Sequence, residues 1–112
     1  MLSLKRLKVS NFVTNQVTNM SLMFCECSLL KKLNLSNFNT NNVTKMSCMF
    51  YGCSSLKELK INNFDFSNVT DIDNMFFGCP NELITKMKTQ YNIEIRNEPY
   101  LDFLNFLKNE LK

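Results

Sequence analysis

Apolar and polar residues follow a pattern that recurs every 26 residues along most of the chain. Stretches that begin at Leu4, Leu30 and Leu56 align without gaps. The positions identical in all three stretches are, in the first copy, Leu4, Lys5, Leu7, Asn11, Phe12, Val17, Thr18, Met23, Phe24 and Cys27. A period of about 20 to 50 residues is typical of stacked units that bury an apolar face only against their neighbours. The pattern therefore predicts a solenoid of three 26-residue coils over residues 1–80.

Each repeat opens with the spacing LxxLxL, in which apolar residues such as Leu33 and Leu35 alternate with polar ones. This alternation predicts a short strand with an inner and an outer face, paired in parallel with the strands of the other coils. A polar Asn-Phe turn follows, and we expect its asparagines (Asn11, Asn37 and Asn63) to bond to the backbone of a neighbouring coil. The VTxMxxMF stretch after the turn predicts a short helical segment capped by its threonine, with methionine and phenylalanine pointing inward.

The two ends of the chain depart from this pattern in different ways. No capping segment precedes Leu4, so we expect an open edge that self-associates or continues into further repeats. After Pro80 the sequence predicts a helix over residues 81–90, a strand over 91–96 and a second helix after Pro99. The apolar stripe of that last helix consists of Tyr100, Phe103, Leu104, Leu107 and Leu111. We interpret residues 81–112 as a cap on the third coil within one domain, and a partner-binding or membrane-surface helix is the alternative.

The second repeat, LKKLNLSNFNTNNVTKMSCMFYGCSSL from Leu30 to Leu56, resembles the 26-residue repeat of bacterial surface proteins, a branch of the BspA-like leucine-rich repeats. The resemblance covers residues 4 to about 80. It implies an α/β, right-handed leucine-rich-repeat-like solenoid, often found in secreted, surface-anchored or lipid-linked proteins that serve in attachment or binding. This chain differs from the usual member because it carries no signal peptide, and no apolar run approaches the length of a membrane span.

The composition argues against an enzyme. The chain has 112 residues, enough for one domain, and its net charge of +3 does not by itself indicate nucleic-acid binding. The lack of histidine excludes Ser-His and Cys-His pairs and every zinc site other than an all-cysteine one. Asp71, Asp73 and Glu82 are spaced like calcium-loop ligands, but Phe76 stands where such a loop needs glycine. We therefore predict no catalytic site, no cofactor and no metal site.

Three of the five cysteines, Cys27, Cys53 and Cys79, occupy the same position in successive repeats. Stacked coils would place them about 5 Å apart, where a disulfide is geometrically possible. A ladder of three cannot pair off completely, so we favour reduced core thiols over disulfides. Cys25 and Cys48 lie outside this ladder, and we expect them to be exposed thiols.

Cations gather on the outward positions of the predicted strands. This basic strand face consists of Lys5, Arg6, Lys8, Lys31, Lys32, Lys57 and Lys60, with Glu58 as its acidic member. One interpretation is a solvated face that keeps the sheet soluble; the other is an electrostatic docking face for an anionic partner. Together with the resemblance to BspA-like repeats, which implies a role in attachment or binding, the second interpretation predicts a non-catalytic binding or adhesion module for a protein or polyanionic partner. An intracellular protein-interaction scaffold is the alternative function.

Overall fold

The computed structural model describes residues 12–96 and 107–110. Its sheet pairs β1 (Lys32–Asn34) in parallel with β2 (Glu58–Lys60), in a register that places Leu33 beside Leu59. Helix α1 spans Asn81–Tyr91, and residues 107–110 are also helical. In both strands the central leucine is buried and the two residues that flank it are exposed. The predicted alternation of inner and outer positions is therefore confirmed at these two strands.

The predicted right-handed, leucine-rich-repeat-like solenoid of three coils is wrong. The described residues form a small compact body with two short parallel strands and two helical segments, and the first predicted strand, residues 4–9, lies outside them. The strands are short because each runs at once into a polar turn. After β1, the Asn34 side chain accepts a hydrogen bond from the Ser36 N–H over 3.0 Å, and such side-chain contacts bend the chain away from a ladder.

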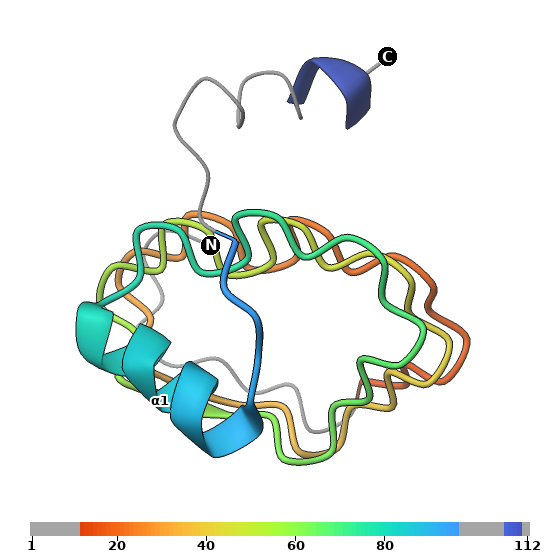
Figure 1. Ribbon diagram of the computed structural model, residues 1–112, viewed down its shortest axis with the longest axis horizontal. Coiled ribbons are helices and arrows are strands. Elements are labelled where there is room, and N and C mark those ends of the chain that lie inside the picture. The colour runs from red at the N-terminus through yellow and green to blue at the C-terminus, as the bar shows by residue number, and fades with distance from the viewer. Residues whose placement is uncertain (1–11, 97–106, 111–112) are drawn as a thin grey trace.

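The helical segments predicted at VTxMxxMF are also absent, and turns take their place. In each repeat one residue of this stretch, Leu22, Cys48 or Asn74, has a positive φ of 65°, 56° or 58°. A right-handed helix cannot pass through a left-handed residue. The N–H groups bond across repeats instead: Phe24 donates to the Met49 carbonyl oxygen, and Phe50 to that of Met75, both over 2.9 Å. In Figure 1 these segments run side by side along one side of the molecule.

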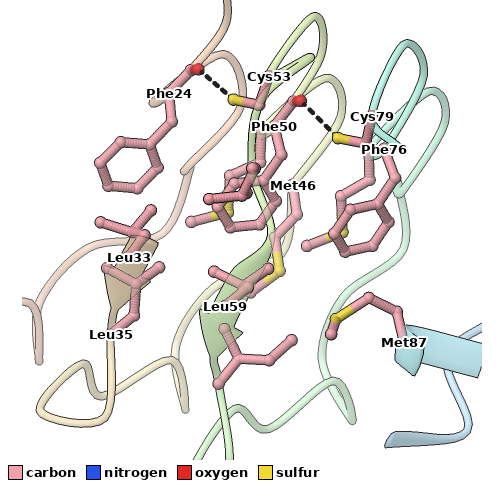
Figure 2. Close-up of a cluster of buried hydrophobic side chains, with 14 of the residues drawn as sticks. Phe24, Leu33, Leu35, Met46, Phe50, Cys53, Leu59, Phe76, Cys79 and Met87 are labelled. Atoms are coloured by element: carbon pink, nitrogen blue, oxygen red, sulfur yellow. Dashed lines mark hydrogen bonds between the residues drawn. The ribbon is translucent and has the colours of Figure 1, made fainter. Parts of the chain in front are cut away.

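The core lies between the sheet and these turns, as Figure 2 shows. The rings of Phe24, Phe50 and Phe76 stack with centroid separations of 5.7 and 5.4 Å, and each ring is almost completely buried. Burial of one such side chain stabilises the fold by about 1.5 to 3 kcal/mol. The expected turn contact is also present, because the Asn63 side chain donates to the Phe38 carbonyl oxygen. The predicted inward position of these phenylalanines and the predicted contact of Asn63 are confirmed, whereas Asn11 lies outside the described residues.

The C-terminal segment covers the third repeat, although its form differs from the prediction. Leu83 and Met87 of α1 are buried against the core, as is Ile93 beyond it. Residues 92–96 are not a strand, because Asn92 adopts the left-handed conformation at the end of α1 and reverses the chain. Of the predicted apolar stripe, Leu107 is described and half-buried. The other stripe residues, Tyr100, Phe103, Leu104 and Leu111, lie outside the described residues.

Candidate functional site: the basic strand face and an adjoining cleft

The described part of the basic strand face lies on β1, β2 and the residue before each. Its members Lys31, Lys32, Lys57 and Lys60 are all exposed, whereas Lys5, Arg6 and Lys8 fall outside the described residues. The Lys57 N–H donates to the Lys31 carbonyl oxygen over 2.9 Å, so these two lysines are neighbours across the repeats. The structure therefore brings together the four predicted cations that it describes.

One of these cations is offset by an acid. The register places Lys32 beside Glu58, and the Lys32 Nζ lies 3.7 Å from the Glu58 Oε2. Both side chains are about three-fifths exposed, so this ion pair adds at most about 1 kcal/mol to stability. Its main effect is to cancel charge. Among the described ion pairs none involves Lys31, Lys57 or Lys60, and the net positive charge of the face is centred on these three.

A cleft of about 320 Å³ adjoins the face, between β2 and α1. Lys57 and Lys60 line it from the strand side, and Lys86 lines it from the helix. At one end of the cleft the Tyr91 hydroxyl donates to the Asn62 side-chain oxygen over 3.0 Å. The cleft is thus a hollow next to the strands with lysines on opposite walls.

Sequence reasoning did not assign Lys86 to the site, because residues 81–90 were interpreted only as a cap. A usable signal exists within α1 itself. Lys86 and Gln90 are four residues apart and share one helix face, while Leu83 and Met87 are the buried residues of the helix. What the sequence could not supply is the packing of that helix beside β2, which depends on tertiary contacts.

The ladder cysteines are structural rather than reactive. The Cys53 thiol donates to the Phe24 carbonyl oxygen over 3.1 Å, and the Cys79 thiol donates to that of Phe50 over 3.2 Å (Figure 2). Burial raises the pKa of Cys79 to about 12 and also raises the pKa of Cys53. Because the thiolate is the reactive form, these cysteines are poor nucleophiles at neutral pH. All five cysteines are free, as predicted for the ladder.

The expectation of exposed thiols outside the ladder is wrong for Cys48, which is fully buried. Burial, with a smaller contribution from Cys25, raises its pKa to about 12. Cys25 is half-buried, and burial together with neighbouring Glu26 raises its pKa to about 11. Cys48 lies in the middle repeat and its N–H donates to the Asp73 carbonyl oxygen of the third repeat over 3.0 Å, whereas the equivalent residue of the first repeat, Leu22, is only partly buried.

Residues 12–96 and 107–110 contain neither a candidate metal centre nor a candidate membrane-spanning helix. No group of three or more potential metal ligands that could hold an ion is found among them. Of the carboxylates with calcium-loop spacing, Asp73 instead lies 3.9 Å from the Arg96 guanidinium. In the same part of the chain, no helix has both the length and the apolar character needed to cross a membrane.

Comparison with known proteins identifies a family whose function is unknown. A family model described as "Mycoplasma protein of unknown function, DUF285" matches residues 2–97. No curated protein and no solved structure matches the chain. The family description states no ligand, partner or activity. It does not test the resemblance to BspA-like repeats, which stays a prediction.

Proposed function

The chain belongs to the DUF285 family, whose function is unknown, and we propose that it is a non-catalytic binding or adhesion module of the BspA-like type. In this proposal the basic strand face, together with Lys86 across the cleft, holds the anionic surface of a protein or polyanion. The observation that carries the proposal is the grouping of three cations on two paired strands: Lys31 and Lys57 are neighbours just before β1 and β2, and Lys60 is the last residue of β2.

The grouping has an electrostatic cost that an anion would remove. Lys31 and Lys57 are joined through their backbones, so their charges lie on neighbouring strands, and like charges in such positions repel. Glu58 offsets the charge of Lys32, but among the residues that the structure describes no acid forms an ion pair with Lys31 or Lys57. A carboxylate- or sulfate-bearing partner would replace this repulsion with attraction, and lysines on both walls of the cleft would hold it from two sides.

The test is binding to immobilised heparin across a salt series. We expect the parent chain to bind at low salt and to lose affinity steeply near 0.1 M salt, where charges more than about 10 Å apart are screened. The double variant Lys31→Glu, Lys57→Glu should bind at least about tenfold more weakly, because each unit charge at about 4 Å is worth about 1 kcal/mol in water.

A matched control reverses two exposed lysines away from the cleft, Lys88→Glu and Lys108→Glu. It changes the net charge by the same amount, so it should retain most of the binding if location matters. Equal losses in both double variants would mean that only net charge is sensed. If the parent chain does not bind heparin at low salt, the proposal is wrong, and the lysines of the basic strand face serve only to keep the sheet soluble.

An intracellular protein-interaction scaffold is the second candidate, and the cysteines favour it. All five are free thiols, and two of the ladder thiols donate hydrogen bonds to carbonyl oxygens of the preceding repeat. Cysteines of exported domains are often paired, whereas those of intracellular proteins stay reduced. Counting thiols in denatured protein from its natural source separates the two candidates: five thiols favour the scaffold, and one or three favour the exported module.

A further inference from the structure

The cleft between β2 and α1 combines an apolar floor with a charged rim. Leu59 of β2 and Leu83 and Met87 of α1 line it, and all three side chains are buried. Its volume of about 320 Å³ lies in the range of sites that hold small molecules, ~300 to 1,000 Å³. A single inorganic anion would leave the apolar floor uncovered. The cleft therefore suits a larger ligand that has an apolar face as well as charge.

The cations of the rim lie at separate points around this floor. Lys57 precedes β2 and Lys60 is its last residue, so the extended backbone sets their Cα atoms roughly 10 Å apart. Lys86 lines the opposite wall, on α1. Within residues 12–96 and 107–110, none of these three lysines forms an ion pair. A ligand that meets all three needs anionic groups spread over its body, whereas a phosphate chain concentrates its charge at one end.

Groups suited to hydroxyls lie between these cations. Gln90 is exposed on α1, and its side-chain amide offers both donors and an acceptor. The bond from the Tyr91 hydroxyl to the Asn62 side-chain oxygen leaves the Asn62 N–H groups as donors and the phenolic oxygen as an acceptor. Glu58 adds a carboxylate acceptor to the same lining. Hydroxyl groups match such a set because each one both donates and accepts, whereas a bare anion would be repelled by Glu58.

We propose that the cleft binds one or two sugar units of an anionic polysaccharide whose sulfate or carboxylate groups sit at separate ring positions. The anionic groups pair with Lys57, Lys60 and Lys86. The hydroxyl groups bond to Gln90 and to the Asn62 amide, and an apolar ring face lies on the floor of the cleft. This inference rests on the proposed function, because it names the ligand class of the same site.

The test is calorimetric titration of the full, reduced chain at low salt with a fully sulfated heparin disaccharide. We expect saturable binding at one site. Inorganic tripolyphosphate, which carries charge but neither hydroxyl-bearing rings nor an apolar face, should bind at least about tenfold more weakly at the same ionic strength. Adenosine triphosphate should also bind more weakly than the disaccharide, because its charge is concentrated in one chain.

An uncharged substitution separates sugar recognition from attraction between charges. Gln90→Met keeps the length of the side chain and removes its amide, so it should weaken disaccharide binding about fivefold. Binding of tripolyphosphate should not change, which also shows that the variant is folded. The matched control is Gln16→Met, at an exposed glutamine outside the cleft, and it should leave the binding of both probes unchanged.

The outcomes distinguish this inference from the proposed function. If immobilised heparin binds and the Lys31→Glu, Lys57→Glu variant loses it, the proposed function stands. The sugar site is nevertheless wrong if the disaccharide binds no better than tripolyphosphate or adenosine triphosphate. It is also wrong if Gln90→Met and Gln16→Met have equal effects on disaccharide binding. If neither heparin nor the disaccharide binds at low salt, both proposals are wrong.

Discussion

Replacing Thr40 by valine removes a reciprocal pair of hydrogen bonds that joins the second repeat to the third. The Thr40 hydroxyl donates to the Asp65 carbonyl oxygen over 3.1 Å and accepts from the Asp65 N–H over 2.7 Å. The side chain is completely buried. Thr14 makes the same pair of contacts to Asn39 one repeat earlier, so this arrangement is a recurring link between repeats.

The expected loss follows from these two bonds. Valine keeps the shape of threonine, so packing changes little, while each hydrogen bond contributes about 1 kcal/mol net. Asp65 is only partly buried, and water can reach part of its unpaired backbone. We therefore expect the free energy of unfolding to fall by about 2 kcal/mol, which lowers the melting temperature by roughly 10 °C in a domain of this size.

The assay is urea unfolding followed by circular dichroism, with Thr89→Val as the matched control. Thr89 lies exposed on α1, where its hydroxyl donates to the Thr85 carbonyl oxygen over 3.0 Å. That substitution should change stability by less than about 0.5 kcal/mol. If Thr40→Val costs no more than the control, the buried hydroxyl does not link the repeats and the reasoning fails.

Three further changes test other parts of the fold. Leu33→Asp buries a carboxylate without a partner, so chemical unfolding should show a loss of several kcal/mol in the free energy of unfolding. The neighbouring exposed substitution Asn34→Asp keeps the side-chain acceptor for the Ser36 N–H and should leave stability nearly unchanged. Equal losses in the two variants would refute the assignment of Leu33 to the inner face. Glu26 has a φ of 64° at a position where the other repeats carry glycine, and a left-handed conformation is strained for glutamate. Glu26→Gly should therefore raise the free energy of unfolding by up to about 1 kcal/mol. A fall in the free energy of unfolding would contradict this reasoning. Burial raises the pKa of Cys48 from 9.0 to about 12, so the folded state holds this proton more tightly. Stability should therefore fall as pH rises from about 9 to 12, and less steeply in Cys48→Ala.

The repeated apolar positions were predictable because their spacing alone fixes which side chains share a face. Leu33 and Leu59 lie inward as the alternation indicates, and the phenylalanines of successive repeats stack in one column. The exposure of the four described lysines followed from the same pattern. Period and polarity were sufficient for these residues because burial depends mainly on apolar surface.

The local backbone was less predictable, because leucine and cysteine give no signal for a left-handed conformation. Leu22 and Cys48 adopt it under tertiary constraint, and this turned an expected helical segment into turns. Of the three equivalent residues only Asn74 belongs to a type that enters this region readily. The cleft could not be predicted from the sequence for a related reason. Lys86 and Lys60 line the same cleft only because α1 packs beside β2, and that packing is a tertiary contact.

The proposed function is tested most directly by locating the surface that an anionic probe contacts. A short heparin oligosaccharide, titrated into the isotope-labelled chain at low salt, should shift the amide signals of residues 31–34, 57–62, 86–87 and 90–91. These ranges contain the described lysines of the basic strand face and the helix wall of the cleft. Shifts centred instead on Lys45 or Lys108, or no shifts at low salt, would contradict the account.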